Sequence, residues 1–148
     1  MIHEVRLGEK CQIEELEKSF PQIFVDFSVN DRFAVNEFTK IFTLIENGKC
    51  LGFIIVDILY ERMEITQICV LEQYRKQGKA SQLMEYIIAL ALDKNLQNIT
   101  LEVSKENQAA LSLYQKYGFQ KVAIRKNYYH GIDGILMERK LMKDETNR

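Results

Sequence analysis

The period of the hydrophobic residues changes between residues 80 and 104, and this change constrains the fold more than any other feature. Residues 80–91 carry apolar side chains at helical spacing, which predicts an amphipathic helix packed on a sheet. The members of this stripe are Ala80, Leu83, Met84, Ile87, Ile88 and Ala91. Residues 98–104 then alternate in period two, so a strand is expected with Leu101 and Val103 on one face and Glu102 on the other.

The residues before this helix predict a strand, two helical regions and a three-stranded antiparallel meander. Asn47-Gly48 predicts a hairpin turn, because both residues tolerate positive φ. Pro21 is expected to end the first helix. The expected elements are a strand at Ile2–Arg6, helices at Glu9–Phe20 and around Phe24–Phe38, and strands at Ile41–Glu46, Cys50–Tyr60 and Met63–Leu71.

The residues after the period-two strand predict one more helix and two final strands. Asn107–Tyr117 has helical spacing, and Gly118 lies where a left-handed C-terminal cap belongs. Phe119–Arg125 and Gly134–Leu141 are the expected strands. The order of elements therefore predicts a mixed α/β (α+β) fold with an antiparallel half.

Composition excludes several classes of protein. The 148 residues suit one domain, expected over 1–142, with a charged tail at 143–148. A net charge of −1 disfavours nucleic-acid binding, and no apolar run is long enough to predict a membrane partner. Cys11, Cys50 and Cys69 are far apart in the sequence and form no metal-binding or disulfide pattern. No metal is therefore expected, and the expected location is the reducing cytoplasm.

The loop at residues 71–79 precedes the long helix and could bind a phosphate. A helix N-terminus offers unpaired N–H groups to an anion, and Gly78 lets the backbone approach it closely. Arg75, Lys76 and Lys79 would add positive charge. Taken alone, a single glycine in a basic loop favours a solvated turn in which the glycine only shapes the start of the helix.

Three segments resemble the GNAT superfamily of acetyltransferases. Arg75-Lys-Gln-Gly-Lys-Ala80 matches its [Gln/Arg]-x-x-Gly-x-[Gly/Ala] acetyl-CoA signature, and Leu101–Phe119 resembles its strand–Asn–helix–Gly-Phe pattern. Arg125–Tyr129 is similar to the Arg-x-Asn-Tyr-Tyr segment of RimI-type ribosomal-protein-alanine N-acetyltransferases. The resemblance covers about half of the chain. It implies a GNAT fold with a mostly antiparallel sheet of six to seven strands and about four helices.

The resemblance also implies a reaction and the residues that serve it. Acetyl-CoA would donate its acetyl group directly to an amine in a ternary complex. Glu102 would be the general base, acting directly or through a water, and Tyr114 would protonate the sulfur of CoA. The residues implied for binding the cofactor are Ile68, Cys69, Val70, Arg75, Lys76, Gln77, Gly78, Lys79, Ala80, Ser81, Asn107 and Tyr114.

Each of these residues also has a purely structural interpretation. Glu102 could be a solvent-facing strand residue, Tyr114 a core tyrosine, and Asn107 a helix N-cap. Cys69 as a nucleophile is rejected, because no histidine has a motif that would pair it with this thiol and a cysteine in an apolar strand is usually inert.

The expected acceptor is the N-terminal amine of a protein, such as a ribosomal protein. Phe20–Phe27, which frames the acceptor site in RimI-type enzymes, lacks the tryptophan common there. A small amine (a polyamine, an amino acid or an antibiotic) therefore stays open as the acceptor. A module that binds acyl-CoA without turnover is the other alternative, and either a monomer or a homodimer is compatible with the sequence.

Overall fold

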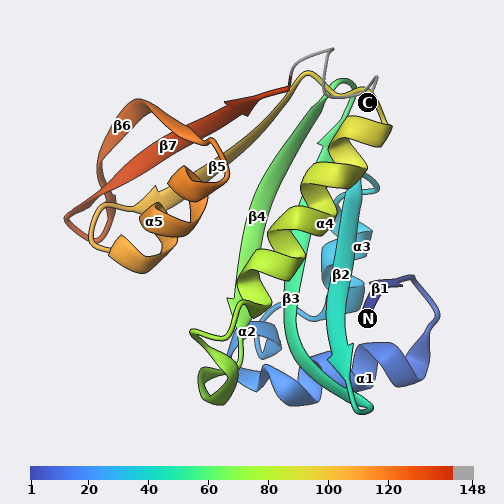
Figure 1. Cartoon of the computed structure of the whole chain (residues 1–148). Coiled ribbons are helices and arrows are strands. Elements are labelled where there is room, and N and C mark those ends of the chain that lie inside the picture. The colour runs from blue at the N-terminus through green and yellow to red at the C-terminus, as the bar shows by residue number, and fades with distance from the viewer. Residues whose placement is uncertain (142–148) are drawn as a thin grey trace. The chain divides into compact units, whose positions relative to one another are not determined.

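The computed structural model describes residues 1–141, so the charged tail at 143–148 lies outside the described residues. Seven strands form one sheet in the order β1-β2-β3-β4-β5-β7-β6 (Figure 1). The elements are β1 (Ile2–Val5), α1 (Lys10–Ser19), α2 (Pro21–Phe24), α3 (Val29–Val35), β2 (Thr39–Glu46), β3 (Lys49–Leu59), β4 (Arg62–Val70), the 3-10 turn η1 (Glu72–Tyr74), α4 (Lys79–Asp93), β5 (Asn98–Ser104), α5 (Gln108–Lys116), β6 (Gln120–Tyr129) and β7 (Ile132–Lys140).

The predicted α+β class, with a mostly antiparallel sheet, is confirmed. The chain forms two compact units. The first unit consists of Met1–Ile58 and Gln67–Tyr86, and the second of Leu59–Thr66 and the chain from Ile87 onward. The predicted single domain stays a prediction. None of the helices within residues 1–141 is long and apolar enough to cross a membrane.

The strands of the first unit are buried on both faces. Ile41, Phe53 and Ile55 pack in one apolar cluster with residues of α1, α2 and α3. The next residue along β2, Phe42, points to the opposite face, where its ring centroid lies 5.1 Å from that of Tyr86 on α4. Because both faces are covered, β3 reads as a nearly continuous apolar run rather than an alternating one.

Helix α1 ends at Ser19, directly before the predicted boundary at Pro21, because the residue that precedes a proline is disfavoured in helical backbone and Phe20 has φ of −129° and ψ of 59°. Pro21 is in addition the first residue of a second short helix, α2, which was not expected there. Proline is favoured there because the first N–H of a helix has no carbonyl partner within the helix. The Ser28 side chain accepts the N–H of Asp31, and the Asp31 carboxylate accepts the N–H of Ser28, so a capping box opens α3.

Two glycines fix the path of β3. Asn47 and Gly48 have φ of 53° and 75°, so the predicted hairpin turn between β2 and β3 is confirmed. A side chain at Gly52 would place its Cβ 2.8 Å from the carbonyl oxygen of Cys69. Only glycine therefore allows β3 to approach the end of β4 this closely.

The second unit is built around β5. This strand pairs parallel with the start of β4, where Met63 lies opposite Ile99, and antiparallel with β7, where Glu102 lies opposite Leu136. The bounds predicted for β5 are confirmed, and so is the left-handed Gly118 with φ of 87° after α5. The strand predicted at 119–125 is longer than expected and continues to Tyr129.

Candidate active site

The phosphate-loop candidate of the first unit lies between η1 and α4. Lys76 and Gly78 adopt left-handed backbone conformations, with φ of 60° and 77°. A Cβ built on Gly78 has no other atom within 4 Å, so the backbone there is open to a ligand. The N–H of Gln82 donates to the carbonyl of Gly78 at 3.1 Å. The N-terminal end of α4, with its partial positive charge, therefore follows directly on this open loop, as an anion site at a helix N-terminus requires.

Arg75 holds this loop to the end of β4. Its Nε donates a hydrogen bond of 3.1 Å to the carbonyl oxygen of Val70. Burial raises the pKa of the neighbouring Cys69 thiol, an effect that Arg75 opposes. Cys69 therefore stays a thiol at neutral pH, which is consistent with its rejection as a nucleophile. Val70 is buried, whereas Ile68 and Cys69 are half-buried.

The charge of Lys79 is already paired within the first unit. Its Nζ lies 2.8 Å from Oε2 of Glu46, and its side chain is only 16% exposed. Gln77 turns back to donate to the carbonyl oxygen of Gln73 at 3.1 Å. Lys76 is exposed, so it is the loop lysine best placed to meet an anion from solvent. Ala80 and Ser81 follow in the first turn of α4 and are half-buried.

In the second unit, Glu102 projects from the face of β5 opposite its apolar residues, as predicted. Its side chain is 18% exposed, and its Oε1 lies 3.1 Å from Nε of Arg125 on β6. Oε1 is itself buried and has no hydrogen-bond partner among the described residues. The contact with Arg125 is therefore an ion pair without hydrogen-bond geometry, and the carboxylate keeps an unused acceptor site.

Three residues around Glu102 were not predicted as site residues. The guanidinium carbon of Arg125 lies 4.7 Å from the centroid of the Tyr128 ring, which packs edge-on against Tyr129. Burial raises the pKa of Tyr129, and the negative charge of Glu102 raises it further. The Arg-x-Asn-Tyr-Tyr resemblance was the signal that could have identified Arg125, Tyr128 and Tyr129.

Tyr114 is a core residue of the second unit, as its structural interpretation expected, and its catalytic role stays a prediction. It is 6% exposed, and its ring packs 5.9 Å from that of Phe119, as expected for a core tyrosine. Burial raises the pKa of Tyr114 to about 12, and the charge of Tyr129 adds to the effect. The phenol therefore keeps its proton throughout the neutral range. The second unit thus carries both a carboxylate that can accept a proton and a phenol that can donate one.

The buried phenol should make stability fall at high pH. The pKa of Tyr114 rises on folding from 10.0 to about 12, so its contribution is complete below pH 10 and is lost as the pH rises towards 12. The contribution lost is about 2–3 kcal/mol. We expect the free energy of unfolding of the wild type, from urea titrations, to fall more between pH 9.5 and 12 than that of Tyr114→Phe. Parallel curves for the two proteins would contradict the burial of this phenol.

Asn107 is the N-cap of α5. Its Oδ1 accepts a hydrogen bond of 3.1 Å from the N–H of Ala110, so the side-chain oxygen caps the helix, as the structural interpretation expected. The amide nitrogen of Asn107 is the side-chain group left for a ligand contact. Within residues 1–141, no cluster of three or more His, Cys, Asp and Glu side chains could hold a metal ion.

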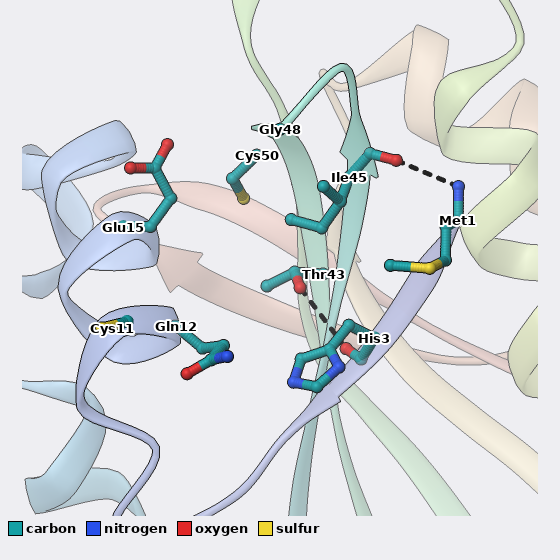
Figure 2. Close-up of a pocket in the computed structure, with 9 residues that line it drawn as sticks. All are labelled: Met1, His3, Cys11, Gln12, Glu15, Thr43, Ile45, Gly48 and Cys50. Carbon is teal, nitrogen blue, oxygen red and sulfur yellow. Dashed lines mark hydrogen bonds between the residues drawn. The ribbon is translucent and has the colours of Figure 1, made fainter.

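A cavity of about 260 Å³ in the first unit involves none of the predicted site residues (Figure 2). It lies between α1 and the β1–β2–β3 strands, with the His3 ring and the Gln12 side chain on opposite sides. His3 is already paired with Glu9 at 3.0 Å, and burial raises the pKa of Cys50 to about 11. The polar groups of this cavity are therefore largely engaged or neutral.

Comparison with known proteins connects this geometry to one family. The sequence model described as "Acetyltransferase (GNAT) family" matches residues 9–119. A [ribosomal protein bS18]-alanine N-acetyltransferase of Escherichia coli K12 is 34% identical over 93 residues. That match spans 63% of each protein, so the chain covers less than two thirds of this relative's length.

Two solved structures have the same fold. The crystal structure of the ribosomal-protein-S18-alanine N-acetyltransferase from Escherichia coli superposes with a TM-score of 0.78 at 28% identity, covering 95% of this chain and 94% of that one. A GNAT family acetyltransferase from Elizabethkingia anophelis, solved with acetyl-CoA bound, superposes with a TM-score of 0.76 at 24% identity, covering 95% of this chain and 97% of that one.

Proposed function

The chain belongs to the acetyltransferase (GNAT) family, and from this premise we propose that it transfers the acetyl group of acetyl-CoA to the N-terminal α-amine of a protein. The observation that carries the proposal is the pair of proton-transfer groups in the second unit. Glu102 offers a buried carboxylate oxygen without a hydrogen-bond partner among the described residues, and the buried Tyr114 offers a phenol that is protonated at neutral pH. Acetylation of an amine needs both a proton acceptor and a proton donor.

The loop of the first unit fits the pyrophosphate of acetyl-CoA. Two left-handed residues, Lys76 and Gly78, precede the N-terminus of α4, and the space beside Gly78 is open. When bound, acetyl-CoA supplies an acetyl group activated as a thioester. We assign its binding to residues of β4 and of this loop, and we retain Asn107 and Tyr114 as further contacts. The loop and β4 residues are Ile68, Cys69, Val70, Arg75, Lys76, Gln77, Gly78, Lys79, Ala80 and Ser81.

The two ionisable groups receive different roles. Glu102 accepts a proton from the acceptor amine, directly or through a water, which leaves the nitrogen with a free lone pair. Tyr114 holds a proton at its phenol oxygen and donates a hydrogen bond to the sulfur anion as charge develops there. Because a phenol with a pKa of about 12 is a weaker acid than a thiol, whose ordinary pKa is about 8.5, the main contribution of Tyr114 would be this hydrogen bond.

The chemistry of alanine identifies which acceptor amine the relative's name implies. That relative is named as an alanine N-acetyltransferase of a ribosomal protein. An alanine residue has an amine only where it is the first residue of a chain, since its side chain has no nitrogen. An N-terminal α-amine is therefore the acceptor class that this similarity supports.

Cys11, Cys50 and Cys69 are free thiols, which supports a reducing cytoplasm as the site of action.

The test is an acetylation assay with matched peptides. We expect release of the CoA thiol with a peptide that begins with alanine and has a free α-amine, and a mass increase at its N-terminus. The same peptide with a blocked N-terminus but an intact lysine should give none. A panel of polyamines, amino acids and aminoglycosides should give rates at least about tenfold lower, since a peptide-specific site discriminates by differential transition-state binding.

Each other outcome assigns a different function. Faster turnover of a small amine would identify the protein as a small-molecule acetyltransferase. Acetyl-CoA binding without turnover of any amine would identify a module that binds acyl-CoA without catalysis. Acetylation of the blocked peptide at its lysine would show that the acceptor is a side chain.

A further inference from the structure

Arg125 reaches Glu102 across an intervening strand. Glu102 on β5 lies opposite Leu136 on β7, which in turn lies opposite Ala123 on β6. Two residues further along β5, Ser104 lies opposite Gly134 on β7, and Gly134 lies opposite Arg125 on β6. Residues paired in these rows share one face of the sheet, so the side chains of Glu102 and Arg125 emerge on the same face with β7 between them.

Gly134 is the residue that leaves room for this contact. Because it has no side chain, the surface of β7 between Arg125 and β5 is bare at that position. A Cβ there would lie 3.2–3.3 Å from atoms of Tyr128 and Tyr129, so the two rings occupy the space that any other residue would fill. The cluster of Arg125, Tyr128 and Tyr129 over Gly134 therefore depends on this glycine.

The ion pair is loosely held on the arginine side. The Arg125 side chain is 59% exposed, whereas that of Glu102 is 18% exposed. Oε1 of Glu102 is within 3.1 Å of the guanidinium but receives no hydrogen bond from it. In the same conformation the guanidinium also rests over the Tyr128 ring, a contact that does not depend on the carboxylate. Because the arginine end of the pair is exposed and forms no hydrogen bond with Oε1, another cation can replace it at small cost.

We propose that Arg125 is a placeholder cation, which neutralises Glu102 until the positively charged amine of the acceptor displaces it. This inference rests on the proposed function, because it assigns Glu102 as the proton acceptor. An ammonium group has three N–H donors in a tetrahedral arrangement, so it can supply the hydrogen bond that Oε1 lacks. The arginine keeps its contact with Tyr128 and turns its charge towards solvent, and the acceptor's ammonium takes the contact with the carboxylate.

The exchange is needed for the proton transfer that follows. A guanidinium never gives up its proton in a protein, so while Arg125 is adjacent it only opposes protonation of the carboxylate. An ammonium can transfer a proton from its nitrogen to the Glu102 oxygen, and the N–H bonding electrons become the lone pair of the amine. The neighbouring row of paired residues contains one other carboxylate, that of Glu138 opposite Thr100. Its Oε2 already accepts a hydrogen bond of 2.6 Å from the Asn98 side-chain amide. Of these two carboxylates, Glu102 is therefore the one with an acceptor atom left for an incoming ammonium.

The first test observes the displacement without requiring turnover. The probe is alanine amide, which carries an α-ammonium, added to wild-type protein in the presence of CoA. The Arg125 Nε–H resonance is assigned by its absence from the spectrum of Arg125→Gln. We expect a saturable shift of this resonance with alanine amide and none with N-acetylalanine amide, which has no charge. A shift that is equal with both compounds, or absent with both, would overturn the proposal.

The second test is kinetic and separates a placeholder from a binding or structural role. In Arg125→Gln the acceptor no longer competes with an internal cation, so we expect its KM to fall about two- to fivefold. Arg125→Lys retains the charge and should keep the wild-type KM within about twofold. A higher KM in Arg125→Gln would show that Arg125 binds the acceptor or supports the strand, and would refute the proposal. If the wild type acetylates no amine, the proposed function fails, while the resonance test still decides whether an ammonium displaces Arg125.

Discussion

Replacing Glu102 by glutamine is expected to lower kcat/KM for amine acetylation by about 10²- to 10⁴-fold. Glutamine has nearly the same shape, but its amide cannot accept a proton from an ammonium at neutral pH. The side chain is 18% exposed, and removing its charge leaves Arg125 facing solvent, so we expect no loss of fold. The rate of CoA thiol release at subsaturating peptide is the measurement.

Two controls separate lost chemistry from lost structure. Binding of acetyl-CoA, measured by calorimetry, should stay within about threefold of the wild type, because Glu102 is not among the residues assigned to the cofactor. Glu106→Gln removes an exposed carboxylate from the turn after β5 and should change the rate less than about twofold. If Glu102→Gln retained wild-type turnover, the proton would have to leave the amine by another route.

The features that the sequence predicted well are those determined by a few neighbouring residues. Asn47-Gly48 forms a hairpin because both residues accept positive φ, and Gly118 ends α5 for the same reason. The alternation at 98–104 placed Glu102 on the correct face of β5, because side-chain direction in a strand follows from period two. Local conformational preference and local periodicity were sufficient in these cases.

The length of β6 could not be predicted, because it depends on pairing with a distant segment. The strand continues past Arg125 to Tyr129 through a bulge, in which Asn127 has φ of 55°. The N–H of Asn127 donates to the Asp133 carboxylate, a contact across the hairpin. Pro21 illustrates a related limit. Its ring excludes a helix interior, so the end of α1 could be predicted, but the sequence did not show that the same residue also begins α2.

The ion pairs of the candidate site could not be predicted from the sequence either. Resemblance placed the loop glycine, the strand carboxylate and the helix tyrosine on the expected elements. It gave no sign that Lys79 pairs with Glu46 or that Arg125 pairs with Glu102, because these partners come from different elements whose side chains meet only in the folded sheet. Ion pairing therefore changes which cations remain for a ligand, and it had to be observed in the structure.

Replacing Phe53 by alanine is expected to lower the free energy of unfolding by about 3–5 kcal/mol. Phe53 is fully buried, with its ring 4.8 Å from Phe20 edge-on and 5.4 Å from Phe24, so it joins β3 to the helical segment around Pro21. Truncation removes the apolar contacts and leaves a cavity that these two rings can only partly fill. Urea denaturation followed by circular dichroism measures the change.

The matched control is Phe38→Ala, which removes the same ring from a residue that is 43% exposed. We expect it to cost less than about 1 kcal/mol, because little apolar surface returns to water. The loss at Phe53 is a large part of the about 5–15 kcal/mol that stabilises a typical domain, so this variant should also lower the thermal midpoint by about 10 °C. Equal losses in the two variants would mean that the packing of Phe53 against Phe20 and Phe24 does not hold the first unit together. A large loss at Phe53 alone would locate the stability of this unit in the aromatic cluster that anchors β3.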